Sequence, residues 1–145
     1  MAAEDRVKYW VDVASDDLSL AEIIFNAGRW LYVAFMCHQA IEKTLKAYWV
    51  HARPDEPPYT HSHMKLIEGC GLLEEMTEEQ LKFIDFMVPM NIEARYPDYK
   101  RALAGKLNEQ KAKYIIEQTK DLLQCIHQKF SQKTKPSASS ETTSE

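Results

Sequence analysis

The sequence predicts an all-α protein, folded as an up-and-down bundle of about five helices. Apolar residues recur at spacings of three and four along several segments, which is the period of an amphipathic helix. No segment alternates apolar and polar residues convincingly as a strand would, and no internal repeat is evident. The 145 residues fit a single domain that can bury one core.

Two long helices are expected first. Residues 7–25 carry an apolar residue every three or four positions, and Gly28 suits the end of that helix. The second helix is expected over residues 30–51 and ends near Pro54. Residues 55–58 then form a loop, because two of them are prolines, which have no N–H to donate to a helix.

Two shorter helices follow. One is expected from Ser62 or His63 to Cys70, before a glycine. The next begins at Thr77, because Thr77 and Gln80 stand three apart in the pattern of a capping box.

The last part of the domain contains one more long helix. Pro89 predicts a kink or an early end of the helix before it, since its ring removes a backbone hydrogen bond. Asn108 caps the last helix, which keeps its apolar period to Phe130. We therefore expect one domain over residues 1–130 and a disordered Ser/Thr-rich tail over 131–145, which has too little to bury.

Composition excludes several classes of protein. The net charge of -4 argues against a generic nucleic-acid binder, although a local basic cleft remains compatible with it. Cys37, Cys70 and Cys125 form no CxxC pair, which fits a reducing compartment. No apolar run approaches the ~18 residues of a membrane span, and no signal peptide is evident. We expect a cytoplasmic protein that does not enter a membrane.

A polar stripe follows the second helix. Gln39, Lys43 and Lys46 stand at i, i+4 and i+7, and Glu42 precedes Lys46 by the four residues that favour an ion pair. Two interpretations stay open. The stripe is either a solvated helix face or a set of donors that faces a phosphate or a nucleobase.

The sequence surroundings of the histidines favour structural roles over catalysis or metal binding. His38 lies on the apolar face of the second helix, which is typical of a core or interface histidine. His61 and His63 lack further ligands at the spacing of a zinc site, so we expect no metal there. Instead, Thr60, His61 and Ser62 should order the start of the third helix by accepting bonds from its free N–H groups.

Arg95 is the most informative cation in the sequence. Pro97 biases Tyr96 away from helical geometry, so Arg95 should lie at or near a helix end. An arginine in such a place can clamp a phosphate or carboxylate through two parallel hydrogen bonds. The alternative is an internal salt bridge to Glu42 or Asp98, and the sequence leaves both open.

The stretch AFMCHQAIEKTLKAYWV, the pair Thr60-His61 and the later EARYPD together resemble the HEPN domain. The resemblance covers residues 5–130 approximately. It implies an up-and-down helical bundle, usually a homodimer. The sequence also resembles the prokaryotic HEPN proteins that are encoded beside a minimal nucleotidyltransferase, and some such pairs of proteins act as toxin and antitoxin.

The same resemblance bears on catalysis. Ribonuclease members carry an arginine and, after four to six residues, a histidine in a cleft at the dimer interface. Arg95 matches the arginine, but the next histidine is the distant His127. Tyr99 stands near the partner position, and tyrosine is known there in members linked to nucleotidyltransferases. Tyrosine has a reference pKa of about 10 and is a poor base near neutral pH, so we expect little or no ribonuclease activity.

These observations lead to one functional prediction and two alternatives. We expect a HEPN protein that binds a nucleotide or an RNA phosphate and that partners a minimal nucleotidyltransferase, without a cofactor or metal. The polar cleft would contain Gln39, Lys43, Lys46, Arg95 and Tyr99. The alternatives are a metal-independent ribonuclease toxin that uses Arg95 with a substituted partner, and a dimerisation module with no ligand.

A homodimer is also expected from the apolar pattern. Trp30, Phe83 and Phe86 fall off the main helical stripes, and exposed apolar residues of this kind commonly mark interfaces.

Overall fold

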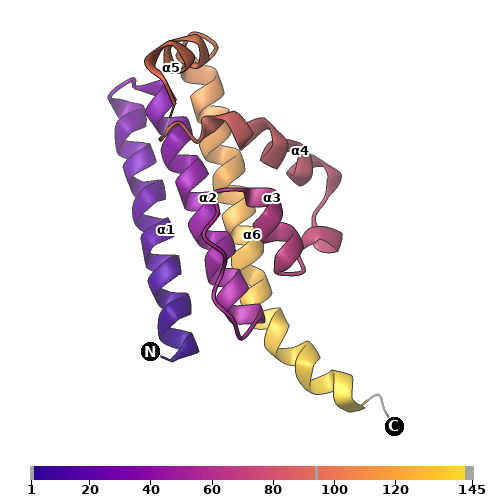
Figure 1. Ribbon diagram of the computed structural model, residues 1–145. Coiled ribbons are helices and arrows are strands. Elements are labelled where there is room, and N and C mark those ends of the chain that lie inside the picture. The colour runs from indigo at the N-terminus through magenta and orange to yellow at the C-terminus, as the bar shows by residue number, and fades with distance from the viewer. Residues whose placement is uncertain (1, 94, 143–145) are drawn as a thin grey trace.

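The computed structural model describes the backbone of residues 2–93 and 95–142, and the side chains of residues 2–93 and 95–131. Within these residues it contains helices and no strand, which confirms the predicted all-α class. The elements are α1 (Ala3–Asn26), α2 (Trp30–Ala52), α3 (His63–Gly69), η1 (Leu73–Glu75), α4 (Glu78–Met87), η2 (Val88–Met90), α5 (Pro97–Ala104) and α6 (Glu109–Thr142) (Figure 1).

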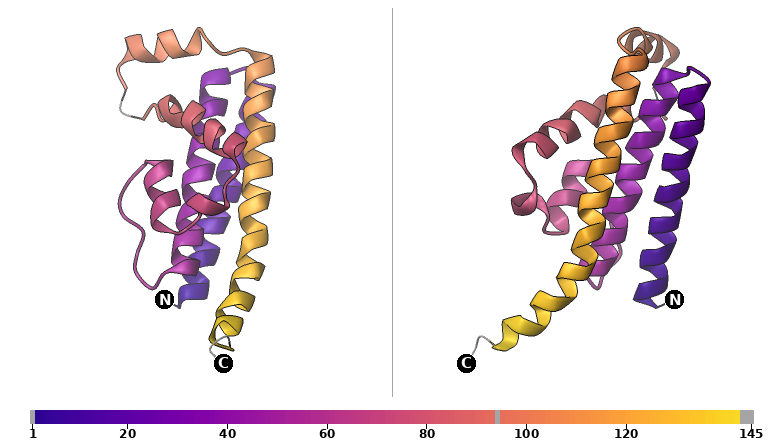
Figure 2. Two further views of the ribbon diagram at one scale, coloured as in Figure 1. Left: turned by 90° about the vertical axis from the view of Figure 1, so that its right-hand side faces the viewer. Right: turned by 180° about the vertical axis from the view of Figure 1, so that it is seen from behind.

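Helix α2 lies at the centre of the bundle. The long helices α1 and α2 run antiparallel, and α6 lies along α2 (Figure 1). Helices α3 and α4 cover the side of this layer that is opposite α1, and the short α5 lies across the end of the bundle at which α6 begins (Figure 2). None of the helices in the described part is long and apolar enough to cross a membrane.

The sequence of α2 explains its central place. Its apolar residues extend round most of the helix, and a helix of this kind is buried on all sides. Ile41 and Leu45 are fully buried, and the small residues Ala34, Ala40 and Ala47 allow neighbouring helices to approach closely. The site described below is therefore attached to a helix that is buried along most of its length.

The helix starts that the sequence predicts are confirmed. Thr77 Oγ1 accepts a bond from the Gln80 N–H at 3.0 Å, and Gln80 Oε1 accepts from the Thr77 N–H at 2.9 Å, which completes the capping box. Asn108 Oδ1 accepts from the Lys111 N–H at 2.8 Å at the start of α6. Pro89 lies in η2, where α4 tightens into a 3-10 turn and ends.

Helix α5 was not predicted. We used Pro97 only to place Arg95 near a helix end, but Pro97 also occupies the first position of α5, where proline has no N–H to lose and its φ already suits a helix. Tyr96 is the extended residue before that helix, with φ -71° and ψ 155°. Arg95 therefore precedes a helix.

The structure bears on two further expectations, the interface residues and the C-terminal tail. Phe83 is 3% exposed and belongs to the core, so its inclusion among the interface residues was wrong, whereas Phe86 is 40% exposed. The backbone of α6 continues to Thr142, into the segment that we expected to be disordered. Side chains after Ser131 lie outside the described residues, and the domain boundary at residue 130 stays a prediction.

Candidate functional site

A buried carboxylate on α2 holds a histidine from the loop before α3. Glu42 is 2% exposed, and its Oε1 lies 3.0 Å from His61 Nδ1. Its other oxygen, Oε2, accepts a bond from Lys46 Nζ at 2.9 Å. Lys46 is itself buried, and its ammonium lies 5.4 Å from the ring centre of Trp10 on α1. The predicted Glu42–Lys46 ion pair is confirmed, but it is buried and does not form a solvated face.

This arrangement fixes the direction in which His61 can act. Since a carboxylate oxygen only accepts hydrogen bonds, Nδ1 of His61 donates to Glu42. Nε2 is then the nitrogen left for other partners. Two charge-assisted bonds offset the cost of burying Glu42, so the histidine is anchored to α2 by a rigid group.

His63 lies only two residues further on but enters the core. Its ring stacks on His38 with 3.9 Å between the ring centres, and its Nε2 donates to the His38 carbonyl at 3.0 Å. Burial lowers the pKa of His38 to about 2 and that of His63 to about 4. His38 is a core histidine as predicted, although its Nδ1 has no hydrogen-bond partner among the described residues.

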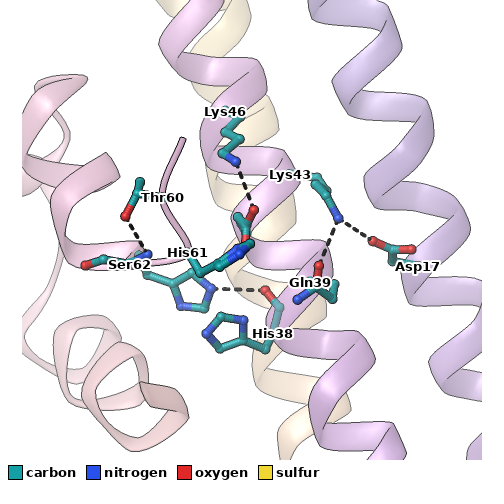
Figure 3. A network of polar contacts seen from close by, with 10 residues as sticks. Asp17, His38, Gln39, Lys43, Lys46, Thr60, His61 and Ser62 are labelled. Atoms are coloured by element: carbon teal, nitrogen blue, oxygen red, sulfur yellow. Dashed lines mark hydrogen bonds and ion pairs between the residues drawn. The ribbon is translucent and has the colours of Figure 1, made fainter. Parts of the chain in front are cut away.

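The loop before α3 is fixed by its own side chains. Ser62 Oγ caps α3 by accepting from the Lys65 N–H at 3.2 Å, and Thr60 Oγ1 accepts from the Ser62 N–H at 3.1 Å (Figure 3). Thr60 and Ser62 thus order the start of α3 as predicted. His61 instead uses its ring to reach Glu42.

The other half of the predicted stripe faces α1. Lys43 Nζ donates to Gln39 Oε1 at 3.1 Å and to Asp17 Oδ2 of α1 at 3.2 Å (Figure 3). Burial raises the pKa of Asp17, and the Lys43 ammonium opposes that rise. Lys43 and Gln39 therefore join α1 to α2 through a part-buried polar contact.

Arg95 is held in place without an acidic partner. Its Nε donates to the Asn91 carbonyl at 3.3 Å, and its guanidinium carbon lies 4.8 Å from the ring centre of Tyr99. No described carboxylate lies within ion-pair distance of it. Asp98, one of the two partners that the sequence left open, pairs with Arg101.

His61 and Arg95 line the same surface cleft. The cleft has a volume of about 350 Å³, and Asn91 and Glu93 complete its lining. Asn91 Oδ1 is buried and has no hydrogen-bond partner among the described residues. The cleft thus combines an anchored imidazole with a guanidinium that has no carboxylate partner among the described residues.

The structure does not collect all five predicted site residues in this cleft. Arg95 lines it and Tyr99 supports Arg95, whereas Gln39 and Lys43 face α1. Lys46 is connected to the cleft only through Glu42 and His61. Sequence reasoning did not assign His61, Asn91 and Glu93 to the site. Only the Thr60-His61 pair gave a signal, and it carried no information on the partner of the histidine.

The cysteines offer no nucleophile in the core. Burial raises the pKa of Cys37 to about 12 and that of Cys70 to about 11. A thiol reacts as the thiolate, so both remain in the unreactive form near neutral pH.

The helical bundle and its sequence motifs define the class of protein. The family model of the HEPN domain matches residues 7–129, so the chain belongs to the HEPN family, as the resemblance indicated. Among curated proteins, none matches the chain.

A solved structure supports the fold. The crystal structure of the Thermus thermophilus protein TT1696 is similar with a TM-score of 0.72 and 19% sequence identity. The likeness covers 86% of this chain and 98% of that chain. At this identity it shows a common fold.

Proposed function

We propose that this HEPN protein binds a phosphate group of a nucleotide or of RNA in the cleft between His61 and Arg95. The observation that carries the proposal is the guanidinium of Arg95, which lines a cleft and has no acidic partner among the described residues. A guanidinium binds phosphate through two parallel hydrogen bonds. The ring of Tyr99 keeps it in position before a ligand arrives.

The rest of the cleft leaves room for more than a free phosphate ion, because its volume is about 350 Å³ and Asn91 adds a polar side chain to its lining. Glu93 opposes an anion in the same cleft, but its carboxylate is exposed, and water and salt screen it.

Calorimetric titration with ATP, AMP and short RNA oligonucleotides tests this proposal. Arg95→Lys should weaken binding by about 1–3 kcal/mol, because lysine lacks the planar fork. Arg101→Lys is the matched control, since Arg101 is already paired with Asp98. Glu93→Gln should strengthen binding by removing the like charge. Equal affinities for wild type and Arg95→Lys would contradict the proposal.

A second candidate function, metal-independent cleavage of RNA, is favoured by the Glu42–His61 contact. A histidine held by a carboxylate is a common arrangement for proton transfer, and it restores the group that is missing after Arg95. Nε2 of His61 would take the proton of a ribose 2′-hydroxyl while that oxygen attacks the phosphorus and the bond from phosphorus to the 5′-oxygen breaks. The leaving 5′-oxygen would take a proton from water, which leaves a 2′,3′-cyclic phosphate on one fragment and a 5′-hydroxyl on the other. Arg95 would stabilise the charge on the phosphate.

Incubation with RNA in EDTA separates this candidate from binding alone. Cleavage by wild type that is lost in both His61→Asn and Arg95→Ala would establish it, and Tyr99→Phe shows whether the phenol takes part. Intact RNA at a concentration where titration shows binding would leave the protein as a binder.

We further propose a homodimer and a minimal nucleotidyltransferase as partner, which the family resemblance implies. An apolar groove of about 290 Å³ between η2, α5 and α6, lined in part by Phe86, Met90 and Leu103, supports the dimer. Sedimentation at micromolar concentration should show a dimer that Phe86→Glu dissociates. A monomer under these conditions would contradict it.

A further inference from the structure

Two tyrosines next to the cleft are more exposed than every other large apolar side chain in the described part of the protein. Tyr59 is 95% exposed and Tyr96 is 82% exposed. Tyr59 lies two residues before His61, and Tyr96 follows Arg95 directly. The ring of Tyr59 contacts the ring of His61, which lines the cleft, and Tyr96 is the chain neighbour of Arg95, which also lines it. An aromatic ring left in water gains nothing for folding.

The loop holds Tyr59 in place. Pro57 and Pro58 restrict the backbone before it, and the bond from the Ser62 N–H to Thr60 Oγ1 fixes the turn after it. Its ring meets the ring of His61 edge-on, with 5.9 Å between the centres and 60° between the planes. The ring is thus held beside the cleft while its faces stay open.

Electrostatic attraction cannot supply much affinity for a nucleic acid here. The net charge is -4, and Arg95 shares its cleft with Glu93. Proteins that hold single strands gain affinity from bases that stack on aromatic rings, which does not depend on charge. Tyr59 and Tyr96 leave such rings exposed on the two chain segments that contribute His61 and Arg95 to the cleft.

We propose that Tyr59, with Tyr96 on the other segment, stacks on unpaired bases of single-stranded RNA whose phosphate lies between His61 and Arg95. This rests on the proposed function and adds the substrate class. A duplex keeps its bases stacked inside and offers none to the rings. Single strands are therefore preferred to duplexes, and oligonucleotides to mononucleotides.

Fluorescence anisotropy with a labelled eight-nucleotide RNA, and with the same strand in a duplex, tests the inference. Tyr59→Ser should weaken single-strand binding about 5- to 100-fold, and Tyr59→Phe should not, because the ring and not the hydroxyl stacks. Tyr96→Ser should give a smaller loss. Tyr32→Ser is the matched control, since Tyr32 is a 45% exposed tyrosine on α2. The affinity should also fall only slightly with salt, because about one cation contacts the phosphates.

The outcomes separate the two proposals. If Arg95→Lys weakens RNA binding and Tyr59→Ser does not, the stacking inference is overturned and the phosphate site stands. The same holds if duplex binds as tightly as single strand. If wild type binds neither RNA nor a mononucleotide, the phosphate site itself is wrong. AMP contains only the base next to its phosphate. If Tyr59→Ser loses RNA binding but keeps the wild-type affinity for AMP, Tyr59 does not stack on that base. Stacking next to the phosphate is then overturned, and Tyr59 stacks on a base further along the strand.

Discussion

His61 and His63 are two residues apart and have opposite surroundings. The side chain of His61 is 41% exposed and takes a buried carboxylate as its partner. His63 is 3% exposed and stacks on a second imidazole in the core. Ser62, which caps α3, lies between them, so the residue before the cap faces the cleft and the first residue of the helix faces the core.

The difference shows that the partner on α2, and not the residue type, decides what each histidine does. Glu42 offers an acceptor at the edge of the core, where one face of the imidazole remains in water. His38 offers only its carbonyl and an apolar ring face, which suit a neutral imidazole. One histidine is therefore available for chemistry, and the other stabilises the packing of α3.

The largest expected effect comes from the anchor of the cleft. Glu42→Leu leaves the buried ammonium of Lys46 without its carboxylate, which should lower the free energy of unfolding by about 3–5 kcal/mol in urea titrations. It also frees His61. The double variant Glu42→Leu with Lys46→Met should recover most of the stability, because replacing a whole buried pair by apolar groups is often nearly neutral. A loss below about 1 kcal/mol in the single variant would contradict this account.

The two buried histidines, His38 and His63, should make the stability of the protein sensitive to acid. Burial lowers the pKa of His38 and His63 to about 2 and about 4, from an ordinary value of 6.5. The unfolded chain therefore binds more protons below pH 6.5, and stability is lost as pH falls from there through the folded-state values. Between pH 7 and pH 4.5 each imidazole should remove about 2–3 kcal/mol.

Unfolding measured across this pH range in wild type and in His63→Leu checks the effect. The variant should retain a shallower pH dependence, since one of the two imidazoles is gone. Parallel curves for the two proteins would show that His63 does not remain neutral in the folded state.

Helix α3 depends on a close approach that a methyl group would block. A Cβ on Gly69 would lie 2.2 Å and 2.5 Å from two ring carbons of Trp49, so Gly69→Ala should cost about 1–3 kcal/mol by forcing α3 away from α2. His63 moves with α3, whereas the carboxylate of Glu42 stays on α2.

Gly105→Ala is the control for that variant. A Cβ there meets only carbonyl oxygens at 3.6 Å, and Gly105 has an ordinary negative φ of -66°, so the change should be nearly neutral. Equal thermal stabilities of Gly69→Ala and wild type would mean that the ring of Trp49 moves aside.

Local signals in the sequence were enough for most of the fold. The caps at Thr77 and Asn108 and the apolar period of α2 act between neighbours in the chain, so the helices could be predicted. Helix α5 could not, because a proline that starts a helix and a proline that ends one look alike.

The candidate site was harder to predict from the sequence than the fold. Arg95 was singled out by its place beside Pro97 and by the family resemblance, and Tyr99 by the resemblance alone. Their contact is local, since they lie four residues apart. The contact between Glu42 and His61 joins residues nineteen apart on separate elements, and no spacing rule reaches across a loop that contains three prolines. The sequence also left open whether the stripe of Gln39, Lys43 and Lys46 is a solvated face, because the proximity of Lys46 to Trp10 on α1 is a contact between two helices.

The smallest expected effect concerns the residue between the two histidines. Ser62→Ala removes the cap of α3 and should cost about 1 kcal/mol. Asn108→Ala removes an equivalent cap at α6 and should cost about as much, at a distance from the loop of His61. Only Ser62→Ala should also weaken RNA binding, by about two- to fivefold, because a loop that has lost its anchor must be ordered when the ligand binds. The pair of variants thus separates stability from positioning. Equal RNA affinities in both would mean that Glu42 alone holds His61 at the cleft, and that the cap serves only the buried side.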